Sequence, residues 1–270
     1  MNRIEHTFSE LKHREEKALV GFVTAGDPDP ERSFQIVRSM CRAGLDILEL
    51  GIPFSDPTAD GPVIQRSSAR ALKSKTRLSL IMEMTARLRK ETDIPIILFS
   101  YYNPILSYGA DRFYREAVAS GADGALVVDL PPEESAELIA GWDFSRFALI
   151  RLIAPTTSQQ RMKTIADDAA GFLYLVSKTG VTGSAGLDTS LVGGQVDRLR
   201  EVTALPICVG FGVSTPEDVA ALSRTADGVV IGSAFERLIE ENIDSPDLPE
   251  MVGDQTRIYK NATKSANADL

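Results

Sequence analysis

Histidine and cysteine are scarce in this chain of 270 residues, which contains two of each. His6 and His13 lie near the N-terminus, whereas Cys41 and Cys208 are far apart in the chain. Two distant cysteines make no disulfide framework. Histidines confined to the N-terminus leave the body of the chain without a Ser-His or Cys-His pair and without a histidine metal site. If the chain is an enzyme, carboxylates, lysine or tyrosine must therefore carry its proton chemistry.

Basic residues and long apolar runs are also lacking. Lys and Arg total 29 against 38 for Asp and Glu, a formal net charge of −9 at pH 7. An acidic balance without a basic block argues against nucleic acid or an anionic membrane as the main partner. No run approaches the about 18 apolar residues that a spanning helix needs, and the N-terminus has no apolar signal core. We therefore expect a cytoplasmic protein.

Short apolar runs alternate with amphipathic stretches along most of the chain. Such alternation is typical of βα units in a parallel sheet, whose strands are buried on both faces. Eight units predict an α/β fold of the (β/α)8 TIM-barrel type. Strands are expected at Ala18–Thr24, Leu45–Leu50, Ile94–Ser100, Gly124–Asp129, Phe147–Ile153, Phe172–Ser177, Pro206–Gly210 and Gly228–Ile231. Helices are expected at Pro30–Cys41, Arg77–Lys90, Asp111–Ser120, Pro132–Ala140, Gln159–Ala169, Ser190–Val202, Pro216–Ser223 and Ser233–Glu241.

Two additions to a simple barrel are expected. An extra N-terminal helix is predicted over Glu5–Glu16, and the second βα unit, Gly51–Glu91, has room for an additional helix. We expect a single TIM-barrel domain over residues 1–270, with the barrel at about 17–243 and a terminal helix and frayed tail at 244–270. A doubly wound open sheet is the alternative, but no G-x-G-x-x-G motif follows the first strand.

A short pattern recurs where helices end and strands begin. The segments Ala43–Asp46, Ser120–Asp123 and Thr225–Gly228 each combine small residues with an aspartate just before or at a strand run. Gly44 and Gly121 suit the left-handed conformation that commonly ends a helix. The recurrence favours a fold built from repeated units.

The second strand and the loop after it carry two acidic residues. Side chains of a strand alternate, so Glu49 shares its face with Ile47, and Leu48 and Leu50 occupy the other face. If the leucines meet the helices, Glu49 points into the barrel near its carboxyl end, where barrel enzymes have their active sites. Burial raises the pKa of a carboxyl group and suits it to act as an acid. A paired structural carboxylate is the alternative for Glu49. Asp60 either leans over the same opening or caps the next helix.

Glycine-rich segments follow the last three strands, at 181–183, 210–212 and 232–234. Glycines at neighbouring strand ends, the last of them opening a helix, form backbone N–H cradles for a phosphate. In barrels such a site commonly lies at the loops after strands seven and eight. The three segments therefore predict a phosphorylated substrate.

Three other residues at strand ends are less specific. Asp129 ends the fourth strand and either faces the site or caps a helix. Asn103 is expected in a turn. Lys178 is expected to be a solvated charge rather than a Schiff-base lysine.

Four segments together resemble the tryptophan synthase alpha chain family. They are Phe22–Pro28, Leu48–Pro62, Ser177–Gly183 and Gly210–Ser214, within a match that runs from about Phe8 to about Glu241. The block from Glu49 to Asp60 is the most specific part. The resemblance implies a lyase that cleaves indole-3-glycerol phosphate to indole and glyceraldehyde 3-phosphate by a retro-aldol reaction, with no metal or cofactor in this chain.

The resemblance also implies a role for each matching residue. Glu49 resembles the family's acid/base and Asp60 its second catalytic carboxylate, while Thr182 is the lid residue that meets Asp60 on closure. The indole side of the site is formed by Phe22, Ile64, Phe99 and Tyr174. The phosphate is bound at Gly183, Phe211, Gly212, Gly232 and Ser233.

The implied partner is the tryptophan synthase beta chain, a pyridoxal phosphate enzyme that receives indole in an αββα heterotetramer. Thr58 stands where the family usually has leucine, the lid at Ser184–Asp188 is richer in glycine, and Arg151 lies in a strand position that is usually uncharged. The altered lid and the more polar loop keep a stand-alone lyase as an alternative. A non-catalytic regulatory subunit is another, which the intact Glu49, Asp60 and glycine cradle disfavour. Indole-glycerol-phosphate synthase is more distant, because it would need catalytic lysines on the barrel strands and no expected strand contains one.

Overall fold

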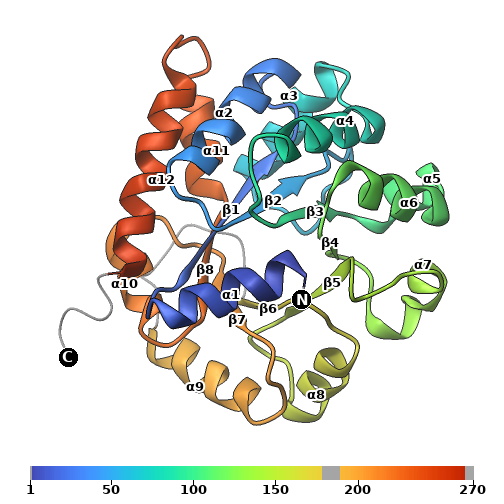
Figure 1. Ribbon diagram of the computed structural model, residues 1–270, viewed down its shortest axis with the longest axis vertical. Coiled ribbons are helices and arrows are strands. Elements are labelled where there is room, and N and C mark those ends of the chain that lie inside the picture. Colours follow the sequence, from blue (N-terminus) through green and yellow to red (C-terminus); the bar gives the residue numbers. More distant parts are fainter. Residues whose placement is uncertain (1, 178–188, 265–270) are drawn as a thin grey trace.

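The computed structural model of the protein describes residues 2–177 and 189–264. Its eight parallel strands form a closed barrel in chain order, and β8 pairs with β1 (Figure 1). They are β1 (Ala18–Thr24), β2 (Ile47–Gly51), β3 (Ile96–Ser100), β4 (Gly124–Val127), β5 (Ala148–Ile153), β6 (Leu173–Val176), β7 (Ile207–Gly210) and β8 (Gly228–Ile231). The predicted TIM barrel is confirmed, and every expected strand is present to within two residues at each end.

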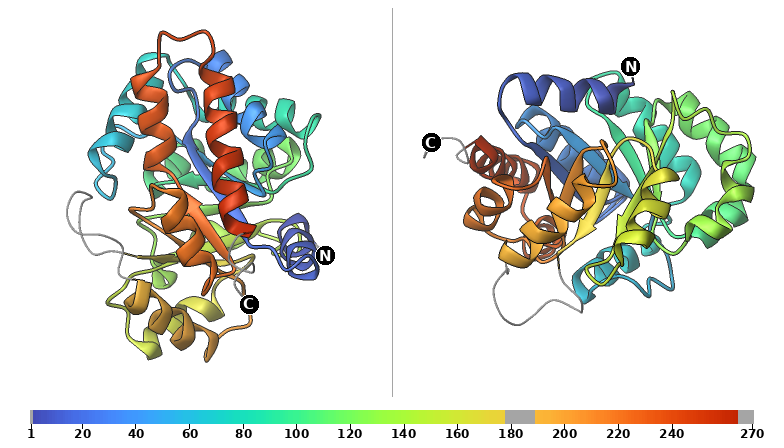
Figure 2. Two further views of the ribbon diagram at one scale, coloured as in Figure 1. Left: turned by 90° about the vertical axis from the view of Figure 1, so that its left-hand side faces the viewer. Right: turned by 90° about the horizontal axis from the view of Figure 1, so that it is seen from below.

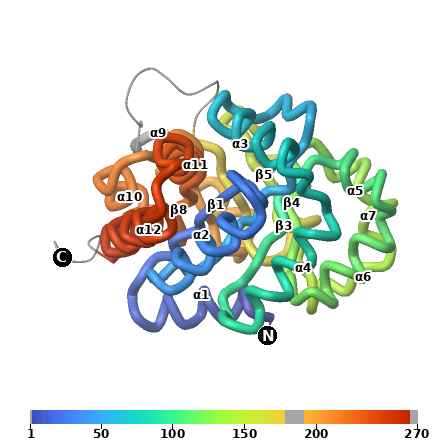
Figure 3. The backbone as a smooth tube through the Cα atoms, turned by 90° about the horizontal axis from the view of Figure 1, so that it is seen from above, coloured from blue at the N-terminus to red at the C-terminus, as the bar shows by residue number. Residues whose placement is uncertain are grey.

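Helices surround the barrel, as the view from above shows (Figure 3). They are α1 (Arg3–His13), α2 (Pro30–Arg42), α3 (Pro62–Lys73), α4 (Leu78–Arg89), α5 (Tyr102–Tyr108), α6 (Ala110–Ser120), α7 (Ala136–Ile139), α8 (Gln159–Asp167), α9 (Thr189–Arg200), α10 (Pro216–Ser223), α11 (Ser233–Glu241) and α12 (Leu248–Lys264), with a 3-10 turn, η1, at Pro132–Glu134. Within the described residues, none of these helices has the length and apolar character needed to cross a membrane.

The apolar side chains form two layers, and the second strand shows how they are divided. Leu48 and Leu50 belong to the layer between the strands and the surrounding helices. Ile47 belongs to the cluster that fills the barrel interior. Alternation along β2 therefore turns Glu49 inward, as predicted.

Helix α1 covers the amino end of the barrel. Ile4, Leu11 and the half-buried Phe8 pack with the interior cluster, and the rings of Phe8 and Phe172 lie 6.0 Å apart. The helix begins with a capping box in which Asn2 and Glu5 satisfy each other's backbone N–H groups. The extra N-terminal helix is thus confirmed, and it closes the end of the barrel opposite to the carboxyl ends of the strands.

The aspartates of the recurring sequence pattern, Asp46, Asp123 and Asp227, have one shared function in the fold. Each lies just before an even-numbered strand and accepts a backbone N–H from the start of the preceding strand. The bonds run from Leu19 to Asp46 (2.7 Å), from Ile96 to Asp123 (2.9 Å) and from Ile207 to Asp227 (3.0 Å). Each carboxylate also pairs with a cation, namely Lys260, Arg89 and Arg200 respectively. The strands are therefore joined in pairs at the amino end of the barrel.

The second βα unit contains two helices, α3 and α4, as expected. The third unit also has two, because Tyr102–Tyr108 forms α5, so the prediction that Asn103 lies in a turn is wrong. Pro104 is tolerated because first-turn N–H groups have no partner within the helix. The carboxylate of Asp129 accepts the Tyr102 N–H at 2.7 Å, so the capping interpretation of Asp129 is correct.

The structure refines the expected elements in two other segments, 132–140 and the C-terminal helix. The single helix expected over 132–140 is wrong, because η1 and the four-residue α7 occupy this segment. At the junction, the Ser135 hydroxyl donates to the Pro132 carbonyl at 2.8 Å. The terminal helix is α12, 17 residues long and packed beside α2 (Figure 2). Its Lys260 is buried and pairs with Glu16 at 3.2 Å and Asp46 at 2.9 Å.

Candidate active site

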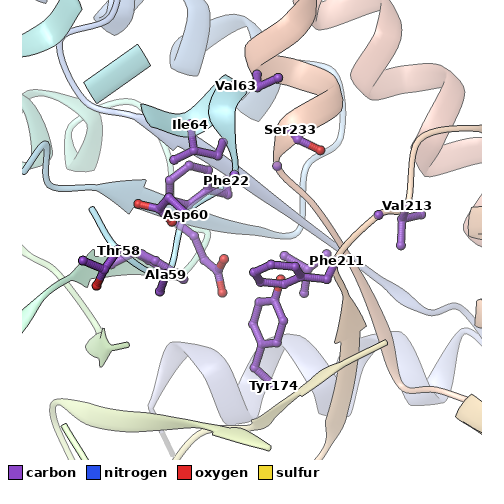
Figure 4. A pocket seen from close by; sticks show the side chains of 16 residues that line it. Phe22, Thr58, Ala59, Asp60, Val63, Ile64, Tyr174, Phe211, Val213 and Ser233 are labelled. Carbon is purple, nitrogen blue, oxygen red and sulfur yellow. The ribbon is translucent and has the colours of Figure 1, made fainter. Parts of the chain in front are cut away.

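A cavity of about 260 Å³ opens at the carboxyl end of the barrel. Strands β1, β2, β3, β6 and β8, the loop before α3, the segment after β7 and the first turn of α11 all contribute to its wall. In Figure 4, Asp60, Ile64 and Phe22 lie toward one side of this cavity, with Tyr174 and Phe211 toward the other. The wall is mainly apolar, with a few polar groups that converge on the same space, which is typical of a small-molecule site.

Glu49 lies at the floor of the cavity and is fully buried. Neither of its carboxyl oxygens has a hydrogen-bond partner within the described residues. Burial without a compensating donor penalises the ionised form. The pKa of Glu49 is therefore raised from 4.5 to about 8, so the group is a neutral acid at pH 7 that can lose its proton within the working range of an enzyme.

Asp60 lines the same cavity from the loop between β2 and α3. The capping interpretation is wrong, because Gly61 is the N-cap of α3 and no side chain caps that helix end. Burial raises the pKa of Asp60 from 3.8 to about 6, and a hydrogen bond from Tyr101 opposes the rise. Two carboxyl groups with different pKa values therefore face one cavity, which suits a division between proton donor and negative charge.

Tyr101, which was not predicted from the sequence, fixes the loop that carries Asp60. Its hydroxyl oxygen accepts the Ala59 N–H at 2.9 Å, so its own proton is free to be donated to Asp60. The side chain is buried, and its ring lies 5.2 Å from that of Phe54. No sequence signal pointed to Tyr101, because its partner Ala59 is 42 residues away in the chain.

Each aromatic ring in the cavity wall leaves room only for glycine at the end of the strand beside it. Phe22 and Phe99 meet edge to face with ring centroids 5.0 Å apart. A Cβ atom on Gly51 would lie 2.7 Å from the Phe22 ring, and one on Gly210 would lie 2.4 Å from the Tyr174 hydroxyl oxygen. Both distances are too short for any side chain. Glycine at these positions therefore keeps the rings in the cavity wall.

A group of backbone N–H donors lies at the other end of the cavity. Phe211 and Gly212 have φ values of 84° and 77°, a left-handed turn that is unusual for phenylalanine. Helix α11 begins after Gly232 without a side-chain cap, so the N–H groups at its start remain available to a ligand. The positive end of the helix dipole also faces this space. Such an arrangement is suited to a phosphate.

The structure brings together ten of the twelve residues predicted for the site. Lining the one cavity are Glu49, Asp60, Phe22, Ile64, Phe99, Tyr174, Phe211, Gly212, Gly232 and Ser233. Thr182, Gly183 and the lid at 184–188 lie outside the described residues, as does Lys178. The wall also contains six residues that were not predicted from the sequence, namely Thr58, Ala59, Gly61, Val63, Val213 and Val230. The alternation of β8 could have identified Val230, whereas the loop residues carry no such signal.

The unusual Arg151 lies away from this cavity. It is buried on the helix side of β5, donates to the Leu130 carbonyl at 2.8 Å and pairs with Asp168. Its Nε atom has no hydrogen-bond partner among the described residues. Arg151 therefore belongs to the packing of β5 and α8, and its presence leaves the cavity unchanged.

The structure defines a (β/α)8 barrel in which one cavity combines two carboxyl groups of raised pKa with the uncapped start of a helix. The sequence profile of the family described as "Tryptophan synthase alpha chain" matches residues 8–266. The chain belongs to the tryptophan synthase alpha chain family.

Individual relatives agree with this assignment. The tryptophan synthase alpha chain of Desulfosudis oleivorans is 64% identical over 264 residues, which cover 98% of this chain and 100% of the relative. That of Desulfatibacillum aliphaticivorans is 61% identical with the same coverage. Among solved structures, tryptophan synthase subunit alpha from Legionella pneumophila superposes with a TM-score of 0.90 at 38% identity, covering 98% of this chain and 99% of that one. A Mycobacterium tuberculosis tryptophan synthase structure superposes with a TM-score of 0.89 at 29% identity, covering 97% and 98%.

Proposed function

We propose that this chain cleaves indole-3-glycerol phosphate to indole and glyceraldehyde 3-phosphate in the cavity above Glu49. The observation that carries the proposal is a fully buried carboxyl group without a partner, beneath a mainly apolar pocket that has an N–H cradle at one end. An indole ring fits between the aromatic walls, and the phosphate of the same substrate fits the start of α11. Family membership supports this reaction.

In the proposed reaction, Glu49 donates a proton to the indole ring and then accepts one from a hydroxyl group of the substrate. Starting neutral, it donates its proton to C3 of the indole, which converts the ring to an indolenine-like electron acceptor. The resulting Glu49 carboxylate then takes the proton of the hydroxyl group next to the breaking bond. The electrons of the C–C bond flow into the ring, the hydroxyl carbon becomes the aldehyde of glyceraldehyde 3-phosphate, and Glu49 is neutral again.

Asp60 has the complementary role in this proposal. Positive charge develops at the indole nitrogen when C3 is protonated, and an ionised Asp60 stabilises it. Because the pKa of Asp60 is about 6 and that of Glu49 is about 8, the combination of ionised Asp60 and neutral Glu49 predominates near pH 7. Proton transfer by Glu49 and charge stabilisation by Asp60 need no histidine, metal or cofactor in this chain.

The indole ring and the phosphate fix the orientation of the substrate. Phe22, Ile64, Phe99 and Tyr174 would line the indole side, and Phe211, Gly212, Gly232 and Ser233 the phosphate side. Thr182 and Gly183 would add the lid contact to Asp60 and a further phosphate contact. We also propose that a tryptophan synthase beta chain, with its own pyridoxal phosphate, receives the indole in an αββα assembly in the cytoplasm.

The experiment is to measure indole release from indole-3-glycerol phosphate by the purified chain, alone and with a beta chain. We expect release by the wild type that increases when the partner is added. Glu49→Gln should abolish release while retaining the fold and the binding of glycerol 3-phosphate. A fully active Glu49→Gln variant would overturn the mechanism, and equal high rates with and without the partner would overturn the proposed assembly.

A matched control separates chemistry from a general effect of removing a carboxyl group. Glu137 is exposed on α7, and Glu137→Gln makes the same change far from the cavity. Its indole release should equal that of the wild type. If Glu137→Gln loses activity as Glu49→Gln does, the assay reports on something other than the proposed acid.

A further inference from the structure

A second buried carboxyl group, Glu236, lies one turn into α11, behind the phosphate end of the cavity. It is fully buried, and the reaction proposed above does not use it. One of its oxygens, Oε1, accepts the Thr24 N–H at 2.5 Å. The other, Oε2, accepts no hydrogen bond within the described residues. Leaving a buried carboxylate oxygen without a donor is costly, so this side chain requires an explanation.

Beyond the end of β8, the Glu236 side chain replaces that strand as a hydrogen-bond partner of β1. The β1–β8 register runs from Ala18 to Gly21 on β1, and β8 ends at Ile231. Beyond that point the chain turns into α11, and the Glu236 carboxyl group accepts the N–H at the end of β1 instead. The first turn of α11 is therefore held against β1 by a side chain. Gly232 and Ser233, at the start of that turn, line the cavity.

Glu236 interacts electrostatically with Asp27 and Arg70, which belong to a network of charged side chains between α3, α11 and the segment after β1. We call this network, with Glu236 included, the α3–α11 clasp. Its other members are Asp27, Arg70, Glu240 and Arg66. Both oxygens of the buried Asp27 side chain accept from Arg70, at 2.7 and 2.8 Å. Arg70 also binds Glu240 at 2.8 Å, and Arg66 binds Glu240 through two bonds of 2.7 Å.

The charges of the clasp balance only if Glu236 carries a proton. Two arginines face Asp27 and Glu240, which together neutralise them. An ionised Glu236 would add a second buried negative charge beside Asp27. Burial, together with the nearby Asp27 charge, raises the pKa of Glu236 well above its ordinary value. A proton on Oε2 both removes that charge and satisfies the orphaned oxygen.

We propose that Glu236 is a positioning residue for the phosphate end of the pocket and acts as a neutral carboxylic acid with its proton on Oε2. This inference rests on the phosphate site proposed above. In the neutral form, Oε1 holds β1 against α11, and the proton on Oε2 removes the negative charge beside Asp27. Loss of the proton would place two like charges together behind the N–H groups that bind the phosphate, and would weaken phosphate binding.

The test compares two proteins that both carry Glu49→Gln, because Glu49 also titrates near pH 8 in the same cavity. One has no other change and the second adds Glu236→Gln, which copies the neutral acid in shape. The binding of glycerol 3-phosphate is measured by calorimetry at about pH 7 and about pH 9.5, a range in which the phosphate is already a dianion, since its second pKa is about 6.

With Glu236 present, we expect glycerol 3-phosphate to bind about tenfold more weakly at the alkaline pH than at neutral pH. With Glu236→Gln, binding should remain within about twofold of the neutral value at both pH values. Glu241→Gln is the matched control, because Glu241 is exposed at the end of α11 and lies outside the clasp. This variant should keep the alkaline decline.

An infrared difference spectrum provides a readout that needs no ligand. At neutral pH, the carbonyl band of a protonated carboxyl group should be present with Glu236 and absent with Glu236→Gln in the same Glu49→Gln background. The absence of that band, or an alkaline decline that persists in Glu236→Gln, would overturn the proposal. If glycerol 3-phosphate binds to neither protein at neutral pH, the proposed phosphate site itself is wrong, and the infrared band still decides the protonation of Glu236.

Discussion

Replacing Glu49 by glutamine should stabilise the fold at alkaline pH while abolishing catalysis. The unfolded chain ionises Glu49 near pH 4.5, whereas the folded protein holds the proton until about pH 8. Folded and unfolded states therefore bind different numbers of protons between these values. The stability of the wild type falls across this interval, because the unfolded state gains the free energy of ionisation first.

The size of the effect follows from the two pKa values. At about 1.4 kcal/mol per pKa unit, the interval from 4.5 to about 8 corresponds to about 5 kcal/mol above pH 8 and about 3 kcal/mol at pH 7. Glutamine does not titrate, so Glu49→Gln avoids this loss. We expect the free energy of unfolding of the variant, relative to wild type, to increase by about 4 kcal/mol between pH 5 and pH 9.

Urea unfolding at about pH 5, 7 and 9, followed by circular dichroism, measures this difference. Exposed Glu137→Gln should follow the wild-type curve at each pH, because its side chain lies in water. Parallel stability curves for Glu49→Gln and the wild type would show that Glu49 ionises equally in the folded and unfolded states. That result would refute the buried neutral acid on which the proposed mechanism depends.

Four further substitutions, used in three experiments, probe other contacts. Tyr101→Phe removes the donor to Asp60, so the Asp60 pKa should rise above about 6 and the acid limb of the pH profile of indole release should move up by about one pH unit. An unshifted profile would exclude that hydrogen bond. Asp168→Leu leaves Arg151 buried without its partner and should cost about 3 kcal/mol in urea unfolding, whereas adding Arg151→Met should recover most of the loss. Lys260→Met should cost about 2 kcal/mol and leave indole release unchanged, since α12 packs away from the cavity.

The barrel and the inward position of Glu49 were predictable because they depend on local periodicity. Apolar runs identify buried strands, and alternation along β2 decides which side chain faces the interior. Glycines at strand ends also carried a usable signal, because the close approach of Phe22 to Gly51 and of Tyr174 to Gly210 excludes side chains there.

The supporting contacts were not predictable because they join distant parts of the chain. Ala59 and Tyr101 are 42 residues apart, and Thr24 and Glu236 are 212 apart. Helix α5 was missed for a related reason. Its first turn reads as a turn in sequence, and the carboxylate that caps it, Asp129, comes from the next strand, 27 residues away.

The aspartates at the amino end of the barrel also affect which side chains face the cavity at the carboxyl end. The side-chain direction along a strand reverses with each residue, so a slip of β2 by one position would point Leu48 inward and Glu49 into the helix layer. Asp46 lies three residues before Glu49, and its carboxylate accepts the Leu19 N–H of β1. This bond ties the start of β2 to β1 and so favours the register in which Glu49 points inward. Asp46 therefore helps to fix the inward direction of the Glu49 side chain, although Asp46 itself does not line the cavity.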